Sequence, residues 1–78
     1  MKVKLRGVRR IEISGEYIRL DTLLKLASVT STGGEAKLRI QNGEAYVDGE
    51  QCKMRGKKIR PDNVVRFGGE TLIVIQST

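Results

Sequence analysis

A run of basic side chains at residues 53–60 is the strongest chemical signal in this sequence. Five of these eight residues are cationic and none is acidic: Lys53, Arg55, Lys57, Lys58 and Arg60. Lys and Arg donate charge-assisted hydrogen bonds to phosphate oxygens, and one guanidinium can bind two oxygens at once. Because the cations repel one another unless a partner or solvent screens them, the run indicates a polyanion-binding loop. The alternative interpretation is a solvated loop without a partner.

A second candidate for phosphate binding is the pair Gly33 and Gly34, which precedes a short helical pattern at residues 34–41. The start of a helix offers unpaired amides and a positive dipole end, and glycine leaves the approach to them open. Equally, the two glycines could serve only to turn the chain sharply between two helices. Gly43 is the expected stop of this helix.

The side chains of the predicted helix at residues 34–41 divide into a core face and two flanks. Ala36 and Ile40 share one face, which is the expected core contact. Lys37 and Arg39 project to either side of that face, where each could contact an anionic partner.

An earlier helix is predicted from an apolar stripe with helical spacing. The stripe consists of Leu20, Leu23, Leu24 and Ala27. Asp21 is the expected N-cap, because its carboxylate can accept hydrogen bonds from the amides of the first turn. Lys25 lies off the stripe, and Arg19 leads into the helix.

Short alternating segments separated by turn signals predict a small sheet. The expected strands are residues 9–13, 44–48, 50–53, 64–67 and 71–75, with a half-buried strand or basic arm at residues 1–7. Asp48-Gly49 and Gly68-Gly69 are expected hairpin turns. Tyr46 and Phe67 are predicted to be core residues.

Length and composition limit the class of function. A chain of 78 residues suffices for one domain and cannot enclose a deep substrate cleft. With no histidine and only Cys52 as a thiol, the sequence shows no acid–base pair and no metal cluster, so we expect neither catalysis nor a cofactor. The net charge of +6 indicates a polyanionic partner, usually a nucleic acid.

The sequence also indicates the cellular compartment of the protein. One cysteine excludes an internal disulfide and fits a reducing cytoplasm. No apolar run reaches the length of a membrane span, and no secretory signal is recognised. We therefore expect a cytoplasmic protein without membrane contact, and a monomer.

Aromatic residues are scarce, which narrows the kind of nucleic acid. Tyr17, Tyr46 and Phe67 are the only three. Proteins that bind single strands usually stack bases on exposed rings, whereas folded RNA is recognised by shape and backbone. The composition therefore favours duplex or folded RNA.

Residues 18–67 resemble a small RNA-binding module, the ribosomal protein S-four-like domain with its alpha-L RNA-binding motif. The resemblance rests on Arg19-Leu20-Asp21, Leu23, Leu24, Leu26, Glu35-Ala36-Lys37, Ile40, Gly43, Val47, Asp48-Gly49, Lys57, Ile59 and Pro61-Asp62-Asn63-Val64. The sequence is most similar to short stand-alone bacterial members, which often carry Gly-Gly before the second helix. Two features depart from the family pattern: Thr32-Gly33 replaces a frequent Ser-Arg, and Arg39 stands where an apolar residue is usual.

The resemblance implies an α+β fold in which two short helices pack on a small, bent antiparallel sheet. It implies one RNA-binding domain over residues 1–78, with a family-like core at 18–67, a basic N-terminal strand or arm and a C-terminal hairpin. The implied partner is structured RNA, with ribosomal RNA or a ribosome precursor as the candidate. The implied nucleic-acid-binding residues are Arg19, Lys25, Gly33, Gly34, Lys37, Arg39, Lys53, Arg55, Lys57 and Lys58.

Two other classes of function remain open from the sequence. One is a protein-interaction scaffold of ubiquitin-like character. The other is a non-specific DNA-binding protein, because phosphate contacts do not distinguish the sugar.

Overall fold

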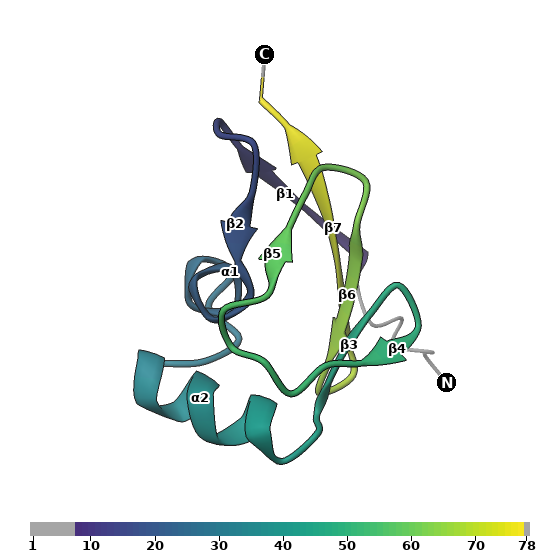
Figure 1. The fold of residues 1–78 in the computed structure, drawn as a ribbon. Coiled ribbons are helices and arrows are strands. Elements are labelled where there is room, and N and C mark those ends of the chain that lie inside the picture. The colour runs from purple at the N-terminus through teal and green to yellow at the C-terminus, as the bar shows by residue number, and fades with distance from the viewer. Residues whose placement is uncertain (1–7, 78) are drawn as a thin grey trace, which may run out of the picture.

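The computed structural model describes residues 8–77, which form two helices and seven strands (Figure 1). In chain order they are β1 (Val8–Ile13), β2 (Ile18–Arg19), α1 (Leu20–Leu26), α2 (Gly33–Gln41), β3 (Ala45–Val47), β4 (Glu50–Gln51), β5 (Lys58–Ile59), β6 (Val64–Phe67) and β7 (Glu70–Gln76). The strand or arm predicted at residues 1–7 lies outside the described residues.

The strands form one five-stranded sheet in the order β1-β7-β6-β3-β4 and a two-stranded sheet of β2 and β5. The predicted α+β class with two helices is confirmed. The sheet is mixed, however, and not purely antiparallel as predicted, because β1 pairs with β7 in parallel. The other pairs of both sheets are antiparallel.

Two tight hairpins confirm the predicted turns. Asp48 and Gly49 connect β3 to β4 with φ angles of 50° and 88°, and Gly68 and Gly69 connect β6 to β7 with φ angles of 58° and 87°. Positive φ at both central residues is the two-residue turn that matches the twist of paired strands.

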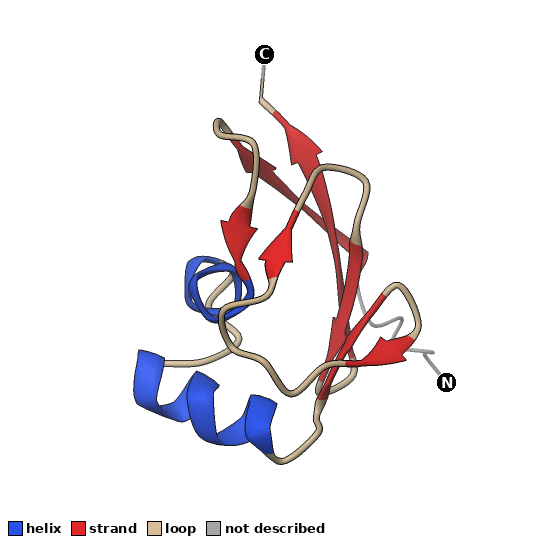
Figure 2. Cartoon of the chain, viewed as in Figure 1, coloured by secondary structure: helices blue, strands red, loops and turns tan. Residues whose placement is uncertain are grey.

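The two faces of the large sheet differ. Helices α1 and α2 and the small β2–β5 sheet lie on one side of it (Figure 2). On this inner face, buried strand residues such as Val65, Leu72 and Val74 pack with Leu20, Leu24 and Ile40 of the helices. The opposite face, here called the outer face, carries Val8, Arg10, Glu12, Tyr46, Val64, Arg66, Thr71, Ile73 and Ile75.

The alternation of side chains along β3 and β6 determines whether each of the two predicted core aromatics is buried. Phe67 is buried, as predicted. Tyr46 is 39% exposed, so its core assignment was wrong. Ala45 and Val47 occupy the inner face, which leaves Tyr46 between them on the outer face.

Helix α1 is not capped by Asp21, contrary to the prediction. The helix begins at Leu20 with Arg19 as N-cap, and no side chain makes the capping hydrogen bond. Instead, the amides of Leu20 and Asp21 donate to the carbonyls of Lys57 and Arg55, at 2.9 and 3.0 Å. The helix start is therefore satisfied by a distant backbone segment, a contact that local sequence rules do not predict.

Helix α2 begins at Gly33, one residue earlier than predicted, because Thr32 is its N-cap. The Thr32 hydroxyl accepts from the Glu35 amide at 3.0 Å, and the Glu35 carboxylate accepts from the Ser31 amide at 2.7 Å. This reciprocal arrangement resembles a capping box. Gly43, with a φ of 87°, lies just past the end of the helix, as predicted.

Candidate nucleic-acid interface

Residues 53–60, here called the basic segment, cross the start of α1. The carbonyls of Arg55 and Lys57 accept from the first two amides of that helix, so the backbone of the segment is fixed on the protein. The five cationic side chains of the segment are all exposed. The structure thus presents this whole charge cluster to solvent on an anchored backbone.

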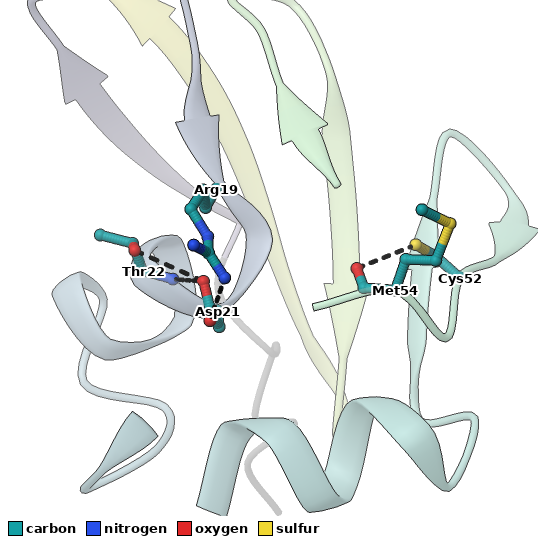
Figure 3. A network of polar contacts seen from close by, with 5 residues as sticks. All are labelled: Arg19, Asp21, Thr22, Cys52 and Met54. Carbon is teal, nitrogen blue, oxygen red and sulfur yellow. Dashed lines mark hydrogen bonds and ion pairs between the residues drawn. The ribbon is translucent and has the colours of Figure 1, made fainter. Parts of the chain in front are cut away.

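Arg19 lies against the basic segment. It pairs with Lys58 in the β2–β5 sheet, and its guanidinium Nη2 is 3.7 Å from the position that a Cβ on Gly56 would occupy. An ion pair with Asp21, at 3.2 Å, holds the guanidinium at the start of α1 (Figure 3). Arg19 therefore adds a sixth cation to the five of the basic segment.

Tyr17 is a member of this surface that sequence reasoning missed. Its ring is 43% exposed, and Nζ of Lys58 and Cζ of Arg60 lie 4.9 and 5.9 Å from the ring centroid. These are cation–π distances, so the ring favours positions of both cations close to itself. Because the contact depends on the pairing of Ile18 with Ile59, no local pattern indicates it.

A groove with a volume of about 570 Å³ lies between the β3–β4 hairpin and the basic segment. Its lining includes Lys53, Lys57 and Lys58, with Asp48 across from them. The Asp48 carboxylate is already engaged, since it accepts from the Asn63 amide group at 2.7 Å and from the backbone of Val64 at 2.9 Å. Arg60 and Glu50 also line the groove, so four cations face two carboxylates and the lining carries a net positive charge.

Cys52 and Met54 are among the residues that line this groove, and Figure 3 shows the Cys52 thiol beside the Met54 carbonyl. The Cys52 thiol is half-buried and lies 3.6 Å from the Met54 carbonyl, while the Met54 side chain is 68% exposed. The groove thus has an apolar portion next to its cations.

The start of α2 offers two backbone amides. Thr32 satisfies the amides of Glu35 and Ala36, through its hydroxyl and carbonyl respectively. The amides of Gly33 and Gly34 make no hydrogen bond within residues 8–77. A Cβ on Gly33 would meet nothing within 4 Å, so packing inside the molecule does not require glycine there.

Lys37 and Arg39 take different roles on α2. Arg39 is half-buried, pairs with Glu44 at 2.8 Å and Glu35 at 3.5 Å, and lies 4.5 Å from the centroid of the Phe67 ring. Lys37 is exposed, and it projects about 200° around the helix from Arg39. Arg39 thus binds the β6–β7 side of the protein, while Lys37 points away from that side.

Two predicted cations remain to be placed: Lys25 on α1, and Lys53 at the first position of the basic segment. Lys25 is exposed and follows Asp21 by four residues, which places it one turn further along the same face of α1. Lys53 lies near the end of α2, with its Cε 3.6 Å from the position of a Cβ on Gly43.

The described cations of the N-terminal region do not join this cluster. Arg9 pairs with Glu70 at 3.8 Å at the start of β7, and Arg10 lies on the outer face beside Ile73. Of the described cations before residue 20, Arg19 therefore lies at the basic segment, and Arg9 and Arg10 do not.

Residues 8–77 show neither a membrane-spanning helix nor a cluster of metal ligands. No helix there is long and apolar enough to cross a membrane. No group of three His, Cys, Asp or Glu side chains in that range is arranged to hold a metal ion.

Similar proteins are known at the levels of sequence and structure. The chain is 39% identical over 59 residues to the probable ribosome maturation protein RlbA of Bacillus subtilis, an alignment that covers 76% of this chain and 83% of the relative. The solution structure of YbcJ from E. coli, described as an alphaL motif involved in RNA binding, matches with a TM-score of 0.71 and 26% identity, covering 96% of each chain.

The sequence model of the S4 domain matches residues 11–75. The match starts before and ends after residues 18–67, so it includes half of β1 and most of β7 as well as the helices and the basic segment. The resemblance inferred from the sequence is confirmed, and the chain belongs to the S4 domain family.

Proposed function

We propose that this protein is an RNA-binding module that grips structured RNA, with ribosomal RNA or a ribosome precursor as its target. Membership of the S4 domain family supports the class of partner, as does the likeness to the RNA-binding motif of YbcJ. The name of the Bacillus relative, a probable ribosome maturation protein, supports the ribosomal target. We propose no catalytic step for it.

The observation that carries the proposal is the anchored basic segment. The carbonyls of Arg55 and Lys57 are fixed on α1, which orders the backbone while the side chains extend into solvent. A backbone that is already ordered loses little conformational entropy when RNA binds, so more of the phosphate interaction energy appears as affinity. Arg19, Arg55, Lys57 and Lys58 form the centre of the proposed contact.

The start of α2 and its exposed flank extend the proposed contact. The unpaired amides of Gly33 and Gly34 can donate to a phosphate, and Lys37 is one turn away on an exposed flank. Lys25 and Lys53 lie at the margins. Arg39 is not among the proposed contacts, because its guanidinium already has two carboxylate partners.

Backbone contacts of this kind fit folded RNA. Tyr17 and Tyr46 are the exposed aromatic side chains in residues 8–77, and they lie on the basic surface and the outer face respectively. The ring of Tyr17 is already approached by two cations. A row of stacking platforms for single-stranded bases is therefore lacking in this part of the chain, and recognition by shape and phosphate position remains.

Charge reversal at Lys57 and Lys58 tests the proposed site. We expect the double variant K57E/K58E to lose about 100-fold in affinity for a folded ribosomal RNA fragment, because two attractions become repulsions. The melting temperature should change by less than about 4 °C, since both side chains are exposed. Fluorescence anisotropy measures the affinity, and thermal unfolding followed by circular dichroism measures the melting temperature.

The matched control is R10E/R66E, which has the same net charge but changes exposed cations of the outer face. Its RNA affinity should stay within about threefold of that of the original protein, and we attribute any such small loss to long-range electrostatics. Equal losses in both variants would show a response to net charge alone and would reject the site.

The alternatives of DNA binding and protein scaffolding are separated by competition and nuclease treatment. We expect folded RNA to displace a labelled RNA probe at lower concentration than duplex DNA of equal length. Equal competition by the two would favour a non-specific DNA-binding protein, and cellular partners that persist after nuclease treatment would favour a scaffold. A monomeric, cytoplasmic protein remains our expectation.

A further inference from the structure

The outer face of the large sheet is a second surface, separate from the basic segment, and no helix or strand of residues 8–77 covers it (Figure 2). Its apolar side chains are Val8, Tyr46, Val64, Ile73 and Ile75. Val8 is 57% and Tyr46 is 39% exposed, and the other three are only half-buried. The register places Val64 beside Ile73 and Val8 diagonal to it, so Val8, Val64, Ile73 and Ile75 form one apolar patch on β1, β7 and β6, whereas Arg66 separates Tyr46 from it. An uncovered apolar patch on a small protein indicates an interaction surface.

The strand register gives this patch a shape. Ile73 and Ile75 run along β7, with Val8 on the β1 side and Val64 on the β6 side. Strands lie about 4.8 Å apart, so the three strands span about 10 Å between their outer axes, which is the width of an α-helix. The patch therefore fits one helix lying along β7.

Charges flank the patch on both sides. Arg10 on β1 pairs across to Ile73, and Arg66 on β6 pairs across to Thr71, so each long margin carries one exposed guanidinium. Glu12 is the acidic residue of this face; it lies on the β1 margin beside Ile75, two residues after Arg10, so this margin carries both signs of charge while the β6 margin carries Arg66. A helix with an apolar stripe and with acidic residues placed opposite Arg10 on one flank and Arg66 on the other complements the two guanidiniums.

The chemistry of the patch favours protein over RNA. Bases stack on aromatic rings, and four of the five apolar side chains of the outer face are aliphatic, with Tyr46 alone offering a ring. Aliphatic side chains give phosphate nothing to bind. We infer that the outer face is a docking surface for an amphipathic, acidic helix of a partner protein, so that the molecule joins a protein on one side to RNA on the other.

A synthetic peptide tests this inference without knowledge of the partner. β7 has seven residues and is about 23 Å long, so the probe is a helix of about 15 residues, with leucines on one face and glutamates on both flanks. In NMR titrations of the full chain, we expect saturable shifts confined to outer-face residues, with a Kd below about 200 μM. The K57E/K58E variant should bind the peptide unchanged while losing RNA.

The matched variant is R10E/R66E, which should weaken binding of the acidic peptide at least tenfold and bind a lysine-flanked version of it instead. Equal binding of a scrambled peptide, or no shifts on the outer face, would overturn the inference. Outer-face shifts with single-stranded RNA in place of the peptide would assign the face to nucleic acid. Nuclear Overhauser contacts from residues 2–6 to Ile73 and Ile75 in the free chain would assign it to the chain itself, and would equally overturn the inference.

Discussion

The two cations of α2 have different surroundings although they lie two residues apart. Arg39 bridges Glu35 within the helix and Glu44 beyond it, and its guanidinium lies near the Phe67 ring. These contacts join the helix to the β6–β7 hairpin. Lys37 has an exposed side chain on the other flank. We therefore assign Arg39 to stability and Lys37 to RNA binding.

Neutral substitutions at these two positions should separate the roles. We expect R39Q to lower the free energy of unfolding by about 1 kcal/mol, since it loses partly exposed ion pairs and a cation–π contact. Its RNA affinity should stay unchanged. K37Q should leave stability unchanged and weaken RNA binding by about fivefold, or roughly 1 kcal/mol. Urea unfolding and fluorescence anisotropy measure both, and the reverse pattern would exchange the two assignments.

At the scale of elements, the starts of the two helices are completed in different ways. The first two amides of α1 are satisfied by carbonyls of the basic segment. At α2, Thr32 and Glu35 form a local cap, which leaves the amides of Gly33 and Gly34 for an external acceptor. The first arrangement fixes the basic segment, and the second provides the helix end proposed to bind a phosphate.

Alanine at Gly33 and Gly34 tests that helix end. Neither residue has a positive φ, and a Cβ would meet nothing within 4 Å at Gly33 and only the Thr32 hydroxyl at 3.9 Å at Gly34. We expect G33A/G34A to gain up to about 1 kcal/mol in stability through helix propensity. RNA affinity should fall severalfold, because the methyl groups stand beside the amides. Unchanged affinity would show that the glycines serve the fold and not the ligand.

Gly43 requires glycine for a structural reason. Its φ is 87°, and a Cβ there would collide with the Gln51 side-chain amide, whose Nε2 donates to the Gly43 carbonyl at 3.0 Å. We expect G43A to lose about 1–2 kcal/mol of stability in urea unfolding. G33A is the control for a harmless alanine, and equal stability of the two variants would contradict this account.

Local patterns predicted much of the fold, because turns and helix faces depend on near neighbours. The stripe from Leu20 to Ala27 and the turns at Asp48-Gly49 and Gly68-Gly69 were all correct. The parallel pairing of β1 with β7 was not predicted, since strand pairing across the whole chain leaves no local trace. The N-cap assignment of Asp21 failed for the same reason, as the carbonyls that replace it come from residues 55 and 57.

The candidate site was predictable in its charges but not in its spatial grouping. The basic segment was evident as a local run of cations in the sequence. Tyr17 was missed because its cation contacts arise from β2–β5 pairing. The Glu35–Arg39 spacing of four residues was a visible signal that Arg39 had a partner within its own helix.

At the scale of the whole molecule, charge and apolar surface are divided between two regions. The basic segment, Arg19 and the exposed flanks of the helices form the proposed RNA surface. The outer face carries the proposed protein surface. A small protein with two such surfaces can hold one partner against the other without any moving part.

Salt dependence should report on the RNA surface as a unit. Each phosphate contact adds about 0.7–0.9 to the slope of log affinity against log salt concentration, through release of counterions. We expect a steep negative slope for the original protein and a slope shallower by about 1.4–1.8 for a K57Q/K58Q variant. Binding isotherms from 50 to about 300 mM salt give both values. A slope that does not change would place Lys57 and Lys58 outside the contact.

The pairing of β1 with β7 also sets when the molecule can be completed during its synthesis. Val8 pairs with Thr71, so β1 cannot join the sheet until some sixty further residues have been synthesised. At translation rates of about 5–20 residues per second, that delay is about 3–13 s. During this delay β1 has no strand to pair with, so its backbone hydrogen-bonding groups are unpaired. A nascent chain with such an exposed strand is a natural client for a chaperone.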